Sequence, residues 1–111
     1  MEILDLIFEC LLNEMTELNS VKTGLPEPYS IYCSFSRASH DVRIKIKRKE
    51  EVVAVFGLRP NIEVIRNNGL PIDIEKLVLK FIRKNHQVIV AYWHRKFQTE
   101  DSFVDRIKPV K

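Results

Sequence analysis

Glycine is scarce in this chain, and its scarcity excludes the common nucleotide-binding loops. The sequence has three glycines, at positions 24, 57 and 69. Phosphate-binding and dinucleotide-binding loops need several glycines within a few residues, because the backbone must approach the phosphates closely. The sequence therefore offers no loop for a nucleotide cofactor, and we expect no cofactor.

Cysteine and histidine are also few, which argues against a metal centre or a disulfide framework. Cys10 and Cys33 fall on predicted core positions, and no CxxC spacing occurs. We interpret them as two reduced structural thiols, with a disulfide or a metal site as the alternative. His86 and His94 lie too far apart for a metal-binding motif, HExxH is absent, and we expect no metal.

A long apolar run is missing as well. A membrane-spanning helix needs roughly 18 consecutive apolar residues, and no segment of the chain reaches that length. The N-terminus carries Glu2, Asp5 and Glu9 where a secretory signal would carry basic residues. These absences predict a cytoplasmic protein that does not enter a membrane.

No arrangement of residues points to catalysis. Ser39, His40 and Asp41 are the residue types of a hydrolytic triad, but adjacent residues point in different directions, whereas real triads are assembled by the fold. The acidic pairs at positions 50–51 and 100–101 fall in a predicted turn and a predicted helix start, where solvation and capping explain them. We therefore expect that the protein is not an enzyme.

Charge is present in abundance, and it is distributed unevenly. Charged residues make up 30% of the chain, and the net charge is +3. The first twenty residues hold five carboxylates and no Lys or Arg, so their net charge of −5 leaves +8 on the remainder. A basic body with an acidic leading segment suggests either an anionic partner or docking between oppositely charged faces.

The leading segment has the pattern of an amphipathic helix from about Glu2 to Leu18. Its apolar residues recur at the spacings of a helix, and Asp5, Glu9 and Glu17 fall on the opposite face. We expect this helix to pack on a sheet. The alternative is a homodimer formed through the same helix, with Asp5 and Glu9 as a possible partner interface.

Four segments after the loop at residues 19–28 read as short strands. Apolar and polar residues alternate from Tyr29 to Phe35 and, most clearly, from Val42 to Lys47. Val52 to Phe56 is apolar on both faces and is therefore expected inside the sheet. Ile62 to Ile65 forms the fourth strand, which the turn residues Asn67, Asn68 and Gly69 end.

The stretch from Pro71 to Phe97 has apolar residues at gaps of three and four, which is a helix period. Asp73 is the predicted N-cap. Asn85 falls on the apolar stripe, so we expect a break there and a second helix from about His86. Gln87 to Trp93 is also rich in β-branched and aromatic residues, and a buried strand is the alternative.

A last short helix is predicted from Glu100 to Ile107, with Thr99 as its N-cap and Pro109 closing it. The chain is expected to form a single domain over residues 1–111. Its predicted fold class is α+β, a four-stranded, mostly antiparallel meander with helices packed on one face, in the order α-β-β-β-β-α-α-α.

The row of Arg43, Lys45 and Lys47 is the strongest candidate for a binding surface. Alternate residues of a strand share a face and lie roughly 6.6 Å apart, which is close to the spacing of successive phosphates in a nucleic-acid strand. Arg37 and Tyr32 are expected beside the row, Tyr32 as the one stacking aromatic. The alternative is the solvated face of an amphipathic strand, or an edge strand protected by charge.

The predicted C-terminal helices carry a second basic surface and the only tryptophan. Lys76, Lys80, Arg83 and Lys84 form a stripe that we interpret as the exposed face of a core helix. Trp93 is interpreted as a core anchor, with a partner-binding patch that includes Lys96 as the alternative.

The C-terminal third resembles a family of small bacterial and phage domains of unknown function. The resemblance rests on Leu77 to Asn85, Trp93, Lys96, and the Thr99–Glu100 pair before a final helix that ends at Pro109. Better-known members carry Pro-Pro-His-Phe-His before the second strand, where this chain has Ser39-His40-Asp41. The resemblance implies an accessory gene of mobile elements or phages, sometimes paired as in toxin–antitoxin systems, and no known reaction.

Two functions follow from these patterns as predictions. The first is a non-catalytic binding module whose basic strand face holds an anionic ligand, with nucleic acid as the leading candidate. The second is a protein-interaction module, such as a toxin–antitoxin component or a phage inhibitor of a host protein. A basic row continuous with the basic C-terminal helices would favour the first.

Overall fold

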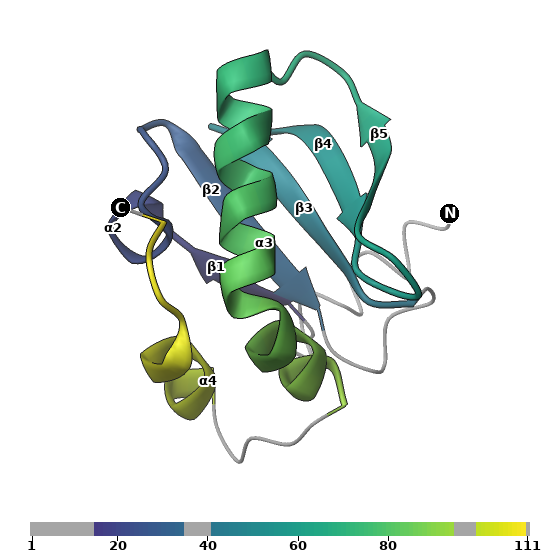
Figure 1. The fold of residues 1–111 in the computed structure, drawn as a ribbon. Helices are drawn as coiled ribbons and strands as arrows, with labels where there is room; N and C mark the ends of the chain where they lie inside the picture. Colours follow the sequence, from purple (N-terminus) through teal and green to yellow (C-terminus); the bar gives the residue numbers. More distant parts are fainter. Residues whose placement is uncertain (1–14, 35–40, 95–99, 111) are drawn as a thin grey trace, which may run out of the picture.

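The computed structural model describes residues 15–34, 41–94 and 100–110, and these ranges contain five strands and three helices (Figure 1). In chain order the elements are β1 (Met15–Leu18), α2 (Ser20–Thr23), β2 (Tyr29–Ser34), β3 (Arg43–Arg48), β4 (Glu51–Gly57), β5 (Glu63–Asn67), α3 (Ile72–Trp93) and α4 (Glu100–Arg106).

The strands form one antiparallel sheet in the order β1-β2-β3-β4-β5. The predicted α+β class and the antiparallel meander are confirmed. The strand count and the element order were wrong, because the sheet has five strands and the described order is β-α-β-β-β-β-α-α. The short helix α2 lies within residues 19–28, which the sequence suggested as a loop.

The additional strand, β1, corrects the predicted first helix. Met15–Leu18 pairs with β2, with Thr16 opposite Cys33 and Leu18 opposite Ile31. Thr16 and Leu18 are buried and Glu17 is exposed, so this short segment alternates as a strand does. The Thr16 hydroxyl is hydrogen-bonded to the Tyr92 hydroxyl on α3, which satisfies a polar group that the strand buries.

The remainder of the predicted first helix lies outside the described residues. Asp5, Glu9, Cys10 and the proposed homodimer surface belong to that part of the chain. Arg37, Lys96 and Thr99 lie in two other ranges that the structure does not describe. Predictions that rest on them therefore stay predictions.

The helix α3 runs without a break for 22 residues, so the predicted interruption at Asn85 was wrong. The helix interpretation of Gln87 to Trp93 is confirmed. Asn85 is buried at 1% exposure, and its side chain bonds to backbone groups of Phe81 and Lys108. A polar residue on the apolar stripe is tolerated because these bonds satisfy it.

The predicted N-cap of this helix was also misplaced. Pro71 occupies the N-cap position, and it makes no side-chain capping bond. A proline suits a helix entrance because its φ is fixed and the N–H it lacks has no partner there. Asp73 lies one residue inside the helix, where its carboxylate faces the positive end of the helix dipole.

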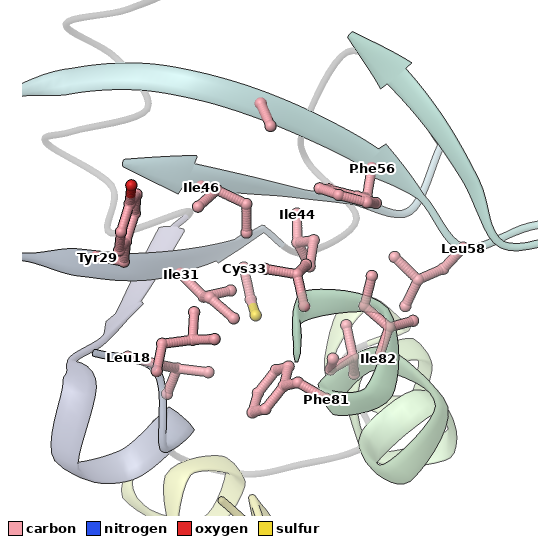
Figure 2. Packing of buried hydrophobic residues seen from close by; sticks show 14 of the residues in the cluster. Leu18, Tyr29, Ile31, Cys33, Ile44, Ile46, Phe56, Leu58, Phe81 and Ile82 are labelled. Atoms are coloured by element: carbon pink, nitrogen blue, oxygen red, sulfur yellow. The ribbon is translucent and has the colours of Figure 1, made fainter. Parts of the chain in front are cut away.

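Figure 1 shows α3 crossing one face of the sheet, with α4 beside its second half. Inward-facing side chains of β2, β3 and β4 meet the buried stripe of α3 in a single cluster (Figure 2). Cys33 lies inside this cluster as a free thiol, and burial raises its pKa to about 12. The predicted core position of Cys33 is confirmed.

The segment after α4 returns along the molecule and closes on α2. The amide of Val110 donates to the carbonyl of Thr23 at 2.8 Å, and Lys84 Nζ donates to the carbonyl of Pro109 at 2.9 Å. The C-terminal segment is therefore held to both α2 and α3.

Candidate anion-binding face of the sheet

The sheet face opposite α3, here called the outer face, carries the predicted basic row. Residues directly opposite on neighbouring strands share a face. Lys45 lies between Tyr32 on β2 and Val55 on β4, and Lys47 lies opposite Ser30. Ile44 and Ile46, which alternate with the basic residues, are fully buried against α3. The alternation in β3 therefore sends Arg43, Lys45 and Lys47 to the outer face together.

The row lies on the central strand of the sheet, which contradicts the alternative of a charged edge strand. The strand β3 is also regular. The pairing of β3 with β4 contains a register shift, but its extra residue is Val53 in β4. The pairing of β4 with β5 contains another, and its extra residue is Ile65 in β5. A regular strand hydrogen-bonded on both sides keeps its alternate side chains about 6.6 Å apart. The three cations are thus evenly spaced on a rigid support.

These cations are not neutralised by described carboxylates. Arg43, Lys45 and Lys47 are half-buried, and none of them makes an ion pair with a residue in ranges 15–34, 41–94 or 100–110. Long basic side chains lay their apolar stems on a surface and keep the charged group in water. The outer face therefore presents positive charge that a ligand can use.

Tyr32 lies within this face and is already engaged on two sides. Lys47 Nζ lies 4.7 Å from the centroid of its ring, a cation–π contact, and its hydroxyl donates to the Glu17 carboxylate. Desolvation first, and then the bond to Glu17, raise the pKa of Tyr32 to about 12. Tyr32 thus positions Lys47, whereas the sequence suggested it as a stacking platform for a base.

We expect Tyr32 to titrate near pH 12 in a near-ultraviolet titration, assigned with Tyr32→Phe. Its folded pKa lies above the ordinary value of 10.0, so the stabilisation is complete below pH 10.0 and is lost as the pH rises toward 12. Glu17→Gln should move the titration part of the way back, because desolvation persists. Glu63→Gln, on the opposite edge strand, is the control, and an unchanged titration in Glu17→Gln would rule out the pairing.

Sequence reasoning missed one basic residue of this face, Arg66. Simple alternation puts Arg66 on the same side as Val64, and Val64 lies opposite the buried Phe56. The extra residue Ile65 reverses the alternation, so Arg66 lies opposite Val55, in the same cross-strand row as Lys45. Neighbouring strands lie about 4.8 Å apart, and Arg66 is two strands away from Lys45, so the backbones of these two residues are about 10 Å apart.

Carboxylates flank the outer face at its two edge strands. Glu17 on β1 lies beyond Tyr32, and Glu63 on β5 lies opposite Gly57, across from Arg43. The positive charge is therefore concentrated along the middle of the sheet, and the acids at the edges limit its width. An anion with a linear array of charges fits such a strip better than a broad acidic surface does.

A separate polar cluster gathers around Arg59, at the connection between β4 and β5. Arg59 donates to Asp41 Oδ1 from Nε at 3.1 Å and from Nη2 at 2.7 Å, and from Nη1 to His94 Nε2 at 3.0 Å. The bond from Arg59, followed by that from the Val42 amide, lowers the pKa of Asp41. Asp41 is thus bound to a guanidinium, and the other two residues of the triad pattern, Ser39 and His40, lie outside the described ranges.

Trp93, the predicted core anchor, lies at the end of α3 beside this cluster. Its half-buried ring packs against the hydrophobic core, and Arg59 Cζ lies 5.1 Å from its centroid. Because α3 covers the opposite face of the sheet, the Trp93 ring lies away from the outer face. The structure therefore does not bring Trp93, from the predicted partner interface, together with the basic row on β3. Trp93 supports the start of the β4–β5 connection instead.

The basic stripe of α3 lies on the far side of the molecule from the outer face. Lys76, Lys80, Arg83 and Lys84 are exposed along α3, and α3 itself covers the opposite face of the sheet (Figure 1). The two basic surfaces are therefore not continuous, so the continuous basic patch that would have favoured a nucleic-acid-binding module is not found among the described residues, and the proposal below rests on the outer face alone. Each has to be considered as a site of its own.

Neither a metal site nor a membrane-spanning helix is found in the described ranges. No three His, Cys, Asp or Glu side chains gather there as a metal site would require. Among the same residues, no helix has the length and apolar character needed to cross a membrane. Comparison with family models, with curated proteins and with solved structures finds no match for this chain.

Proposed function

We propose that the chain is a non-catalytic binding module whose outer face holds the phosphate backbone of a nucleic acid. The observation that carries the proposal is the row of Arg43, Lys45 and Lys47, evenly spaced on the central strand and without an ion pair among the described residues. Arg66 extends the positive strip across β4. No reaction is required of this surface.

The mode of binding follows from the chemistry of the face. Lys47 lies over the ring of Tyr32, and Glu17 accepts a hydrogen bond from its hydroxyl. Stacking of a base on Tyr32 therefore contributes little, and the outer face binds the nucleic acid through its phosphates. Binding by phosphate contacts alone is independent of sequence, and its affinity falls with salt because the counterions released on binding gain less entropy when the salt concentration is higher. For a single-stranded oligonucleotide, three or four contacts predict a log–log salt slope of about −2 to −3.

The test is the binding of a fluorescent mixed-sequence oligonucleotide, measured by anisotropy at several salt concentrations. We expect the double variant Lys45→Glu with Lys47→Glu to weaken binding at low salt by at least about tenfold and to flatten the salt slope. The matched control is Lys76→Glu with Lys80→Glu, which makes the same change of charge on α3. Circular dichroism checks that both variants are folded.

Two outcomes would contradict the proposal. One is the absence of binding at low salt. The other is an equal loss of affinity in both double variants, because this would show a response to net charge rather than to the outer face. Lys45→Gln with Lys47→Gln, which removes charge without reversing it, should fall between the wild type and the double Glu variant.

A protein-interaction module is the second candidate, and the edge strand β5 favours it. In the described sheet β5 pairs with β4 alone, and its side chains Val64 and Ile65 are 41% and 42% exposed. An exposed edge with apolar side chains can accept an extended segment of another protein. The resemblance to toxin–antitoxin-like domains is consistent with this role. This role would be supported if the chain captured a partner protein, if Ile65→Lys abolished the capture, and if the Lys45/Lys47 variant did not change it.

A further inference from the structure

A groove with a volume of about 390 Å³ lies on the side of the molecule away from the outer face. Residues 83–88 of α3 form one wall, and Arg106 and Lys108 from the end of α4 and the following segment form the other. Its volume falls in the range of sites for small molecules, about 300 to 1,000 Å³. The outer face, in contrast, is a sheet surface.

The charged side chains among the described residues that line this groove are all basic. Arg83, Lys84, Arg106 and Lys108 all line it beside Asn85, His86, Gln87 and Val88, and no Asp or Glu is among the described residues of the lining. Asp105, the exposed carboxylate adjacent to Arg106 in the chain, is not part of the lining. A concave surface that carries charge of one sign concentrates the electrostatic potential and attracts counterions of the opposite sign.

The two walls are fixed to each other by the buried side chain of Asn85. Asn85 Nδ2 donates to the carbonyl of Lys108 at 2.8 Å, and the amide of Lys108 donates to Asn85 Oδ1 at 2.7 Å. A second bond from Nδ2 reaches the carbonyl of Phe81 at 3.1 Å. Every polar atom of this amide is therefore used, and the backbone at Lys108 is held against α3.

Further hydrogen bonds hold the same region. Lys84 Nζ donates to the carbonyl of Pro109, which lies just beyond Lys108. His86 Nε2 lies 3.0 Å from the carbonyl of Leu58, which can only accept, so Nε2 carries a proton and the ring is anchored to the β4–β5 connection. A site that is fixed before the ligand arrives loses little freedom on binding.

We propose that this groove binds a small molecule that carries phosphate groups. Arginine matches phosphate through paired N–H donors, and lysine adds a compact charge, so two residues of each type suit a multiply charged phosphate. A single orthophosphate would occupy a small part of the volume, and a nucleoside diphosphate would occupy more of it. This site is independent of the outer face and does not rest on the nucleic-acid proposal.

The experiment is isothermal titration of the full chain at low salt with three probes: ADP, adenosine and inorganic phosphate. We expect ADP to bind and adenosine not to bind, since adenosine lacks the phosphates. Arg83→Glu and Lys108→Glu should each weaken ADP binding by at least about tenfold. Lys76→Glu, which changes the same charge on α3 outside the groove, is the matched control, and Arg83→Gln provides a milder variant if Arg83→Glu does not fold.

The outcomes separate this proposal from the one on the outer face. Loss of ADP binding in the groove variants but not in the Lys45/Lys47 variant supports it. Inorganic phosphate that binds as tightly as ADP also supports it and identifies the free anion as a sufficient ligand. Equal binding of adenosine and ADP, no binding of any probe, or loss of ADP binding only in the Lys45/Lys47 variant would overturn it.

Discussion

Asn85→Ala is expected to lower the free energy of unfolding by about 2–4 kcal/mol. Truncation of the side chain removes its three hydrogen bonds and leaves the amide and the carbonyl of Lys108 without these partners. Partly buried backbone groups that lose their partners cost more than the bonds themselves contribute. The residue is 1% exposed, so a small cavity adds to the loss.

Urea denaturation measures this effect, and hydrogen exchange locates it. The amides of Lys108 and Val110 should exchange faster in Asn85→Ala than amides of β3, because the side chain holds the C-terminal segment to α3. Asn61→Ala, at an exposed position, is the matched control and should change the stability by less than about 0.5 kcal/mol. A similarly small change in Asn85→Ala would mean that the segment is held by other contacts.

Phe81→Ala is expected to have a still larger effect, a loss of about 3–5 kcal/mol. Phe81 is fully buried on α3 and points into the cluster formed with the inward side chains of the sheet (Figure 2). Its truncation removes apolar contacts on both sides of the interface and leaves a cavity that a helix packed along its whole length cannot easily close.

Denaturant unfolding with a conservative comparison tests this prediction. Phe81→Leu keeps most of the volume and should cost much less than Phe81→Ala. If the two substitutions cost the same, the loss would reflect the ring itself and not the volume it fills. A loss below about 1 kcal/mol for Phe81→Ala would contradict the assignment of α3 as the main cover of the sheet.

The sequence allowed much of the sheet to be predicted, since alternation is a local signal. Arg43, Lys45 and Lys47 alternate with buried isoleucines, and this pattern alone placed all three on one face. Met15 and Leu18 misled the prediction because their spacing also continues the apolar period of the preceding residues. A strand as short as β1 contains too few residues to reveal a period of two, and its pairing with β2 is a long-range property.

The break predicted at Asn85 failed for a related reason. A polar residue on an apolar stripe signals either a helix end or a buried partner, and the partner here is the backbone of Lys108, far along the chain. The bonds between Asn85 and Lys108 also hold the two walls of the basic groove together. From periodicity alone, Arg83 and Lys84 were interpreted as part of the exposed face of a helix. The available signal was Asn85 itself, since a buried amide requires partners.

Arg66 shows a further limit. Its face is set by the extra residue Ile65, and a register shift depends on how β4 and β5 pair, which no pattern within β5 records. Alternation therefore predicted the cations of the regular strand β3 and failed for the strand beside an irregular pairing.

The order of the strands has a consequence for how the protein reaches its native state. Every strand of the described sheet lies beside its own neighbours in the chain, without a crossover. Each pairing can form by closing a short connection, which has a small entropic cost and allows the next strand to add to an existing edge. Assembly of the sheet can therefore proceed by a series of local steps, and the docking of α3 has to follow, because its hydrophobic stripe has no surface to bury against until the inner strands have met.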